Sequence, residues 1–377
     1  MRQRTALTAV AVLTTALTLT ACGSTSSSGS ASKATTASSA ADVGGMDALV
    51  AAAKQEGTLN VIALPPDWAN YGAMLDAFGK KYGIKVNSAT PDGSSQDELN
   101  AVTSQRGQDR APDVLDLGTS FAQQAATQNL LAPYRVATWG DIPDGQKDPA
   151  GTWYNDYGGY VSIGCNATVV ATCPTSFADL LKPEYAGKVA LNGNPTQATA
   201  AFAGVWAAAL ANGGSLDDIG PGIDFFKKVK QTGNFNPVEV TPATVQSGET
   251  PISIDWDYLN AGQTQKLKDA GVTWQVHVPT DGLFGGYYSQ AVSKYAPHPA
   301  AARLWEEFLY SDEGQNIWLQ GGARPVRLAA LQRAGTADPA ALAVLPPVQG
   351  TAQFPTEAQQ TAAKKVVSDR WNQEISG

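Results

Sequence analysis

A strand and a helix follow one another directly in Asp113-Val114-Leu115-Asp116-Leu117-Gly118-Thr119-Ser120-Phe121-Ala122-Gln123. The first five residues have the short apolar composition of a buried strand. Ser120 and Gln123 then have the spacing of a capping box, in which the first residue caps a helix and the fourth bonds back to it. A strand, a short turn and a capped helix in this order are typical of a sheet that is covered by helices.

The same alternation continues on both sides of this stretch. Periodicity predicts helices over Met46–Glu56, Tyr71–Tyr82 and Pro299–Leu309, and Ser95 to Glu98 has a second capping-box spacing. Strand-like segments separate the helices, which predicts right-handed crossovers and a parallel sheet. The expected strands are Thr58–Leu64, Ile84–Val86, Lys188–Leu191, Ile252–Asp255, Trp274–Val278 and Tyr287–Val292, and the remaining expected helices are Ala198–Ala211 and Ile223–Lys230.

The length of the chain predicts two lobes. About 330 residues follow the first 45, and a single hydrophobic core stops growing at roughly 250–300 residues. We therefore predict a two-lobed α/β fold, with residues 46–160 and 286–377 in lobe 1 and residues 161–285 in lobe 2. The lobe that receives the last helix, near Thr356 to Trp371, stays open. Ligands of such sheets bind at the carboxyl ends of the strands, so we expect a site in the cleft between the lobes.

The first 45 residues differ in composition from the rest. A basic start, Met1 to Arg4, precedes the uncharged run Thr5–Thr20, which is typical of a secretory signal segment and too short for a span of roughly 20 apolar residues. Leu19-Thr20-Ala21-Cys22 resembles the lipobox of bacterial lipoproteins, which implies that residues 1–21 are removed and that Cys22 is lipidated. Residues 22–45 are rich in Ser, Thr, Ala and Gly and are predicted to form a flexible tether.

Charge and cysteine content narrow the class of protein further. The formal net charge of -8 argues against nucleic acid or an anionic lipid surface as a partner. We expect the protein to be exported and held by its lipid at the outer face of the cell membrane or in a periplasm. Lipidation of Cys22 leaves Cys165 and Cys173 in an oxidising compartment, where we expect them to form a disulfide.

Six short segments carry a resemblance to a known family. They are Ala52–Leu59, Ala111–Gly118, Ser176–Pro183, Gly193–Thr196, Ala296–Trp305 and Tyr310–Gln315. In these segments the chain resembles the type II extracellular solute-binding proteins of ABC importers, in the cluster that serves polyamines, ferric iron, thiamine and phosphonates. The resemblance implies a type II periplasmic-binding-protein fold whose lobes are joined by hinge strands and close over a small-molecule solute.

The same resemblance implies the partners of the protein. The closed form would dock on an ABC permease whose ATPase supplies the energy, and we expect the binding protein to act as a monomer without a cofactor or a bound metal. Gly158-Gly159 and Gly285-Gly286 lie where the hinge strands should cross, and glycine tolerates the backbone angles that a hinge must absorb. An ordinary turn would explain them as well.

Aromatic and acidic residues meet repeatedly at predicted strand ends, a mixture that suits an ammonium group. A ring face attracts a cation and a carboxylate bonds its charged end. Together with the resemblance, this favours a small cationic or zwitterionic organic solute, a polyamine-like one first. The candidate residues of this kind are Asp67, Trp68, Asp92, Tyr154, Tyr157, Trp256 and Asp257.

Two other solutes stay open in the same role. Hydroxyl groups at helix N-termini form anion sites, so Ser94, Ser120 and Thr196 suit an aminoalkyl phosphonate, although plain helix capping explains them too. Tyr287-Tyr288 is similar to the tyrosine pair of ferric-iron binders. Adjacent strand residues point to opposite faces, however, so only one of the two, for which we take Tyr288, is expected to face the cleft.

An extracellular hydrolase is the alternative from another class. The chain has two histidines, His277 and His298, and both fit structural positions. It contains no Gly-x-Ser-x-Gly elbow, no His-Glu-x-x-His pair and no phosphate-cradling Gly-Lys loop. We therefore expect a protein that binds and does no chemistry.

Overall fold

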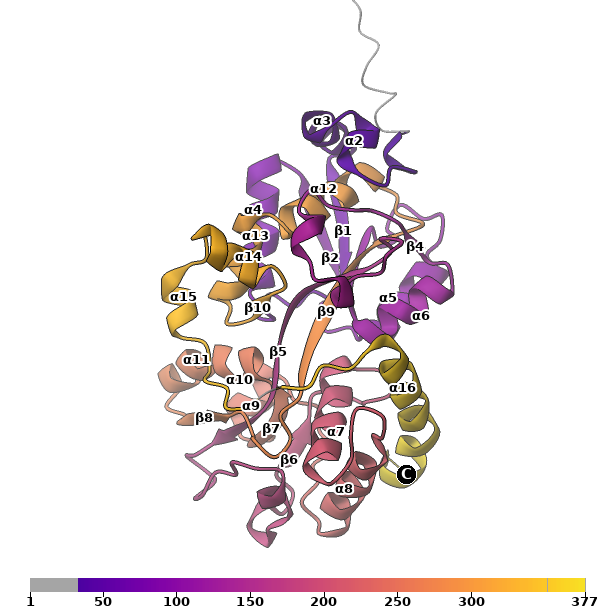
Figure 1. Cartoon of the computed structure of the whole chain (residues 1–377). Helices are drawn as coiled ribbons and strands as arrows, with labels where there is room; N and C mark the ends of the chain where they lie inside the picture. The colour runs from indigo at the N-terminus through magenta and orange to yellow at the C-terminus, as the bar shows by residue number, and fades with distance from the viewer. Residues whose placement is uncertain (1–32, 351, 377) are drawn as a thin grey trace, which may run out of the picture.

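A computed structural model describes residues 33–350 and 352–376 of the chain. The predicted signal segment and Cys22 lie outside the described residues. Two lobes are joined by two long strands, β5 (Tyr154–Asn166) and β9 (Gly285–Ser293), which run from one lobe into the other (Figure 1). Within the described residues, every helix is too short or too polar to cross a membrane.

Lobe 1 contains the N-terminal alternation of strands and helices and the helices that follow β9. Its first elements are α3 (Met46–Glu56), β1 (Thr58–Ile62), α4 (Tyr71–Tyr82), β2 (Lys85–Ala89), α5 (Ser95–Ser104), β3 (Val114–Gly118), α6 (Thr119–Thr127) and β4 (Leu131–Ala132). The later ones are α12 (Pro299–Leu309), α13 (Asp312–Gln320), β10 (Arg324–Pro325), α14 (Leu328–Ala334) and α15 (Pro339–Ala343).

Lobe 2 is formed by the central part of the chain. Its elements are β6 (Val189–Leu191), α7 (Thr199–Ala211), α8 (Gly220–Gln231), α9 (Pro242–Ser247), β7 (Ile252–Trp256), α10 (Asp257–Gly262), α11 (Thr264–Asp269) and β8 (Trp274–His277). Cys165, which is fully buried at the lobe 2 end of β5, forms a disulfide with Cys173, as expected.

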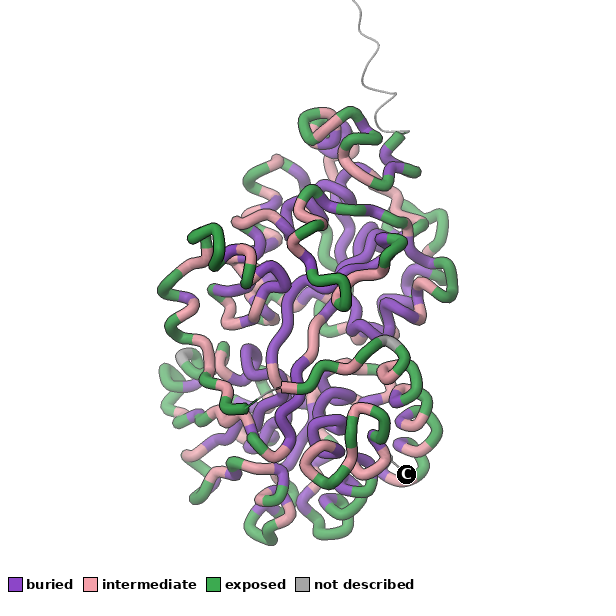
Figure 2. The backbone as a smooth tube through the Cα atoms, in the orientation of Figure 1, coloured by how far each residue is buried: buried purple, intermediate pink, exposed green. Residues whose placement is uncertain are grey.

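The sheets are mixed, and the prediction of a parallel sheet is wrong for the central strands. β1 pairs with β2 and β6 with β7 in parallel, but β5 and β9 run antiparallel to their neighbours. The reason is topological, because β5 carries the chain into lobe 2 and β9 carries it back. β5 is buried along almost its whole length (Figure 2).

The glycines of the predicted hinge lie where β5 and β9 cross, with Gly159 paired to Gly286. A Cβ atom on Gly159 would lie 2.3 Å from Oδ1 of Asp257, and one on Gly286 would lie 2.5 Å from the ring of Trp256. Both contacts are far inside van der Waals distance. These positions therefore need glycine for close packing between the strands and lobe 2.

The amphipathic helices follow their predicted bounds, with α3, α4 and α12 beginning and ending at the expected residues. Two details differ. Ser94 and Asp97 form the capping box of α5, one residue before the predicted pair. α6 begins at Thr119 directly after β3 and has no side-chain cap, so Ser120 lies in its first turn.

The last part of the predicted tether is folded. Residues 33–45 include the short helix α2 (Ala40–Val43), and Ala34, Ala37 and Val43 are buried against lobe 1. The guanidinium of Arg303 in α12 donates to the carbonyl of Ala37 at 2.8 Å. The prediction of a flexible tether over residues 22–45 is therefore wrong for residues 33–45, because a buried arginine binds their backbone.

The C-terminal helix α16 (Glu357–Trp371), which is followed by a π-helical turn (Asn372–Ser376), contacts both lobes (Figure 1). Lys364 donates to Gln124 of α6 in lobe 1, and Arg370 forms an ion pair with Asp224 of α8 in lobe 2. The assignment of residues 286–377 to lobe 1 therefore needs correction at its end, since α16 spans the junction between the lobes.

Candidate functional site

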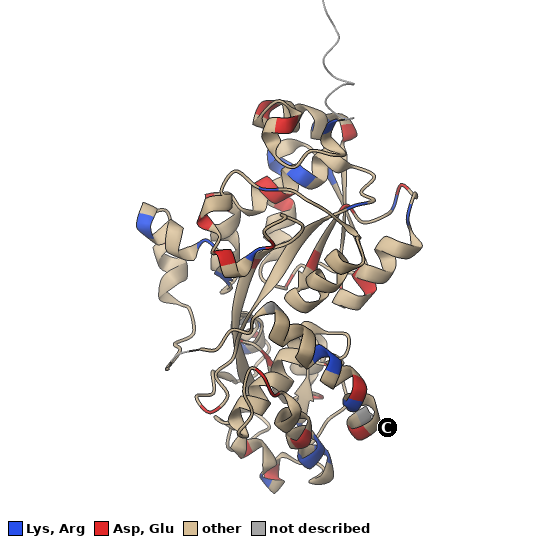
Figure 3. Ribbon diagram, turned by 45° about the vertical axis from the view of Figure 1, so that its right-hand side comes forward, with Lys and Arg blue, Asp and Glu red and all other residues tan. Residues whose placement is uncertain are grey.

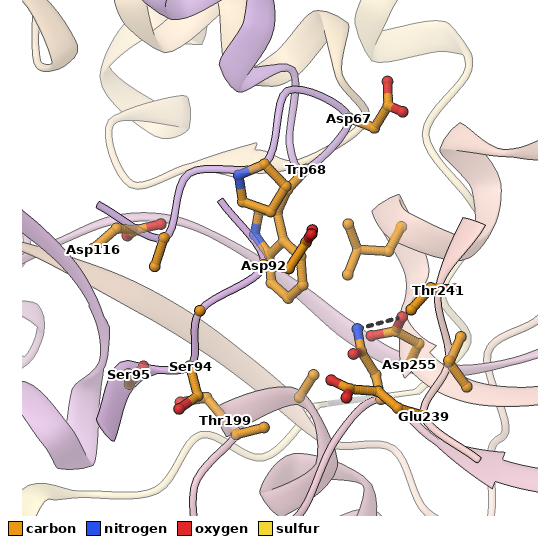
Figure 4. A pocket seen from close by; sticks show the side chains of 18 of the residues that line it. Asp67, Trp68, Asp92, Ser94, Ser95, Asp116, Thr199, Glu239, Thr241 and Asp255 are labelled. Carbon is orange, nitrogen blue, oxygen red and sulfur yellow. Dashed lines mark hydrogen bonds between the residues drawn. The ribbon is translucent and has the colours of Figure 1, made fainter. Parts of the chain in front are cut away.

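The cleft between the lobes contains a cavity of about 260 Å³, which we call the acidic compartment (Figure 4). Lobe 1 lines it with the loops that follow β1 and β2, the start of α5 and the middle of β3. Lobe 2 lines it with the segments that follow β6 and β7 and with the loop before α9. The polar and aromatic lining residues are Asp67, Trp68, Asp92, Ser94, Ser95, Glu98, Asp116, Asn192, Thr199, Glu239, Thr241, Asp255, Gln263 and Tyr288.

Carboxylates from both lobes set the charge of this compartment. Glu98, Asp116 and Asp255 are buried, whereas Asp67, Asp92 and Glu239 are exposed at the rim. None of the described residues that line it is a lysine, arginine or histidine. Elsewhere, basic and acidic positions are interspersed over the outer faces of both lobes (Figure 3), so this imbalance is a local property of the compartment.

Asp255 stands at the carboxyl end of β7. Its Oδ1 accepts a hydrogen bond from the backbone N–H of Trp256 at 2.8 Å, and its Oδ2 accepts one from Nδ2 of Asn192 at 3.0 Å. Burial raises the pKa of Asp255 to about 7, because both partners are neutral and water is excluded. A cation in the compartment would favour the ionised form of this carboxyl group.

Asp116, at the lobe 1 wall, has a similar environment. The hydroxyl of Tyr157 donates to its Oδ2 at 2.8 Å, while its buried Oδ1 has no hydrogen-bond partner among the described residues. Burial raises the pKa of Asp116 to about 7. Glu98 lies beside it and accepts from the backbone N–H of Asp116 at 2.9 Å, and burial raises its pKa as well.

Aromatic side chains form the wall that adjoins these acids. The rings of Trp68 and Tyr288 meet edge to face, with centroids 5.6 Å apart. The indole N–H of Trp68 donates to the hydroxyl of Tyr157 at 2.8 Å. Tyr157 thus connects the ring of Trp68 to the carboxylate of Asp116, and the chain of hydrogen bonds fixes the orientation of all three side chains.

The rim brings charges of both lobes together. Asp67 of lobe 1 forms an ion pair with Lys266 of α11 in lobe 2. Partial burial and the nearby negative charge of Asp92 raise the pKa of Glu239. Since Asp92 belongs to lobe 1 and Glu239 to lobe 2, their repulsion opposes closure of the cleft unless a positive charge lies between them.

A second cavity of about 320 Å³, which we call the aromatic compartment, occupies the part of the cleft beside β5, β9 and the start of α16. Thr199 lines both compartments. Gly118 of lobe 1 packs so closely against Thr199 of lobe 2 that a Cβ atom on the glycine would lie 1.7 Å from Oγ1 of the threonine. This contact between the lobes lies where the two compartments adjoin.

The structure brings five of the predicted binding residues together in the acidic compartment: Asp67, Trp68, Asp92, Ser94 and Tyr288. Tyr157 lies directly behind them, bonded to Trp68. Ser120 and Trp256 line the aromatic compartment instead. Trp256 is separated from the acids because it follows Asp255 in β7, and successive strand residues face opposite sides.

Three predicted residues reach neither compartment. Asp257 is fully buried at the hinge, where it pairs with Arg324 at 2.7 Å and accepts from the backbone N–H of Tyr160. Tyr154 packs against Tyr310 in the core of lobe 1, with ring centroids 4.8 Å apart. Thr196 donates to Asn194 within its own turn. The sequence neighbours on which these three predictions rest do not indicate the residues that Asp257, Tyr154 and Thr196 contact in the folded chain.

Three buried carboxylates of the site were not among the predicted residues, namely Glu98, Asp116 and Asp255. Asp255 has a signal in the sequence, because strand alternation places it on the face opposite Trp256. Glu98 has none, since it matches a capping box and the cap is made by Ser94 and Asp97. Asp116 sits in the middle of an apolar strand, where a lone acid is itself unusual.

Within the part of the chain that the structure describes, the residues typical of metal sites do not converge at the cleft. Over the described residues, the side chains of His, Cys, Asp and Glu form no group of three that could hold a metal ion. Tyr287 lines the aromatic compartment and Tyr288 the acidic one, so the tyrosine pair does not converge on one point. Nδ1 of His298 lies 2.9 Å from buried Asp113, which raises the pKa of this histidine, outside both compartments.

Comparison with known proteins agrees with this architecture. The structure is similar to that of the periplasmic binding protein P5PA, with a TM-score of 0.67 and 19% identity over 85% of this chain and 99% of that one. It is also similar to iron-bound HitA from Pseudomonas aeruginosa (TM-score 0.60, 21% identity, 82% and 97% covered). A putative spermidine/putrescine ABC transporter from Listeria monocytogenes gives a TM-score of 0.62 at 13% identity, with 83% and 98% covered.

At these identities the solved structures establish the fold alone. A search of curated protein sequences gave no match. The sequence profile of the family described as bacterial extracellular solute-binding protein matches residues 109–346, which is more than half of the chain. This chain therefore belongs to the bacterial extracellular solute-binding proteins.

Proposed function

We propose that the acidic compartment captures a small organic cation, preferably a polyamine-like one, and that the closed protein delivers it to an ABC permease. The observation that carries this proposal is the lining itself: six carboxylates from two lobes, with no basic residue among the described lining residues. Buried carboxylates that lack a positive partner are costly, and a bound cation would supply that partner.

The arrangement of the acids favours a molecule with more than one ammonium group. In Figure 4, Asp116 lies on one side of Trp68, and Glu239 and Asp255 lie on the other. A chain that carries an ammonium group at each end could bond both acidic ends while its methylene groups pack on the ring between them. An ammonium group that lies within about 6 Å of the ring face would gain a further roughly 0.5–2 kcal/mol of cation–π attraction.

The other two solutes fit this compartment less well. A phosphonate would bring negative charge to six carboxylates, and the hydroxyl of Ser94 is already bonded to Asp97. Ferric iron would need several converging hard ligands, which Tyr287 and Tyr288 do not provide because they face different compartments. We therefore place both behind an organic cation.

The anchoring proposal is compatible with this role. α2 and α3 lie at the end of lobe 1 that is remote from lobe 2 (Figure 1). A lipid on Cys22 would therefore hold the protein by its far end and leave the cleft accessible to solute and permease. In this arrangement the protein acts as an exported monomer and performs no catalysis itself.

Isothermal titration calorimetry tests the choice of solute. The mature protein is titrated with putrescine, spermidine, 2-aminoethylphosphonate and ferric citrate. At least one of the two polyamines should show saturable binding, whereas 2-aminoethylphosphonate and ferric citrate should show no binding. Absence of heat with both polyamines would remove the preferred solute. Saturable binding of the phosphonate or of iron in their place would overturn the argument from charge.

A further inference from the structure

The aromatic compartment has a lining that differs in kind from that of the acidic one. Rings from both lobes surround it, including Trp206 and Phe284, whose planes stack at a centroid distance of 5.3 Å, and Trp153. Its charged residues, Asp144 and Lys147, pair with each other at 3.3 Å. Over the residues that the structure describes, the lining therefore offers flat apolar surface without an unpaired charge, which suits an uncharged ring.

Gln123 of α6 is one of several polar residues that line this compartment, and both polar atoms of its side chain lack a hydrogen-bond partner among the described residues. The residue is 5% exposed, and the two atoms are Nε2 and Oε1. A buried amide that makes no bond carries the full cost of its lost hydration. Since Gln123 lines the cavity, a ligand with an adjacent donor and acceptor could satisfy both atoms at once.

The segment before α16 also lines the compartment. Phe354 is 44% exposed, which is unusual for a large aromatic side chain, and its ring lies 5.9 Å from that of Tyr287. Gln360 of α16 also lines the cavity. Because α16 contacts both lobes, an occupant would touch lobe 1, lobe 2 and the helix that spans them.

We propose that the aromatic compartment is a second binding site, for an uncharged ring compound that bears a primary carboxamide or an equivalent neighbouring donor and acceptor. The ring lies between the aromatic side chains, and the carboxamide forms two hydrogen bonds with the amide of Gln123. This site is distinct from the cation site, since the contact between Gly118 and Thr199 lies where the compartments adjoin.

Calorimetry and crystal soaking with nicotinamide and benzamide test this site. Both probes should bind with dissociation constants in the millimolar range or below, and the soaked crystals should show the ring in the aromatic compartment. The matched control is 3-acetylpyridine, which keeps the ring and the acceptor of nicotinamide but lacks the N–H donors, and which should bind about tenfold more weakly.

Variants test whether nicotinamide and spermidine bind in different compartments. Gln123→Leu should weaken nicotinamide binding about tenfold and leave the response to spermidine unchanged, whereas Asp255→Asn should leave nicotinamide binding unchanged. Phe354→Ala changes an exposed position and carries little risk to folding. It should also weaken binding of nicotinamide and benzamide, and it replaces Gln123→Leu as the test if that variant does not fold. Failure of both probes to bind at about 10 mM, equal binding of 3-acetylpyridine, or binding that survives both variants would overturn the proposal.

Discussion

The acidic and the aromatic compartment share two strands, and neighbouring residues of those strands face different compartments. In β7, Asp255 lines the acidic compartment and Trp256 the aromatic one. In β9, Tyr288 lines the acidic compartment and Tyr287 the aromatic one. The twofold alternation of side chains along a strand thus sorts charge from ring surface within one cleft.

This difference has a consequence for binding. The acidic compartment should respond to the charge of a solute, to pH and to salt, whereas the aromatic compartment should respond to none of them. Both should respond to anything that keeps the lobes apart, because both are lined by residues of the two lobes. Four changes to the protein or its conditions test the comparison, and we take the largest expected effect first.

Asp255→Asn should weaken spermidine binding by about 30-fold, which corresponds to about 2 kcal/mol for a hydrogen bond to a charged group. Asparagine keeps the shape of the side chain and can still accept from the backbone N–H of Trp256, while Asn192 can turn its amide. Calorimetry measures the loss. Asp76→Asn, at an exposed site of α4, is the matched control and should change affinity less than twofold.

Unchanged spermidine affinity in Asp255→Asn would remove this carboxylate from the cation site. The thermal stability of the variant shows whether it is folded. Since burial raises the pKa of Asp255, its ionised form destabilises the ligand-free protein above pH 7. The variant should therefore be at least as stable as the native protein at pH 8.

Lowering the pH from 8 to 6 should weaken spermidine binding by about tenfold, because the ionised fraction of a carboxyl group with a pKa near 7 falls by about that factor. Asp255 has such a pKa, whereas the two primary amines of spermidine stay protonated throughout. Calorimetry at the two pH values measures the change. Nicotinamide binding, measured in the same way, should not depend on pH in this range.

When the pH is lowered from 8 to 6, the stability of the ligand-free protein should rise, whereas the affinity for spermidine falls. A folded-state pKa that is raised above its unfolded value means that the folded protein holds the proton more tightly. The contribution of Asp116 and Asp255 to stability is therefore complete below about pH 4 and lost as the pH rises through 7. Spermidine affinity that rises as the pH falls would contradict the proposed roles of both residues.

The sequence predicted the elements of the fold better than the composition of the site. Helix α12 follows its predicted bounds because a proline begins it and a strong apolar stripe, including Trp305 and Phe308, faces the core. The strand ends that form the cleft were also predicted, and five of the residues chosen there line the acidic compartment. These features depend on local periodicity, which a single sequence displays.

The errors concern partners that are distant in the chain. The aromatic neighbours of Asp257 favour it as a ligand residue, but its charge is compensated by Arg324, 67 residues later. Glu98 was assigned to a cap, although its carboxylate accepts from Asp116 in the neighbouring strand. Tertiary packing decides that Ser94 and not Ser95 caps α5, and that Glu98 is the acid that becomes buried. No local sequence pattern contains this information.

Gly118→Ala should weaken binding in both compartments by about fivefold, near the lower end of the roughly 1–3 kcal/mol that overpacking costs. The added Cβ atom would lie 2.6 Å from Cβ of Thr199, a contact that rotation of the threonine side chain cannot relieve, so the lobes would have to move apart. Calorimetry with spermidine and nicotinamide measures the two losses. Gly140→Ala, where the added atom meets nothing, is the control.

Thr199→Gly should restore binding to the Gly118→Ala protein, because it removes the atoms with which the new methyl group collides. Loss of affinity for one probe alone would mean that the contact supports one compartment and not closure of the cleft. Unaltered affinity for both would mean that the lobes bind their ligands without reaching this degree of closure.

Trp68→Leu should have the smallest effect, a loss of spermidine affinity of about threefold, which is the lower range of a cation–π contribution at a partly exposed ring. Leucine keeps apolar surface for the methylene groups and removes the ring face. It also removes the indole N–H that orients Tyr157. Tyr157→Phe removes that hydrogen bond together with the one from Tyr157 to Asp116, so its loss of affinity sets an upper limit on the contribution of the Trp68 N–H. The affinity for hexane-1,6-diol, the uncharged counterpart of a diamine, serves as a comparison. If Trp68→Leu lowers this affinity by the same factor as that for spermidine, then Trp68 contributes apolar contact and not attraction of charge.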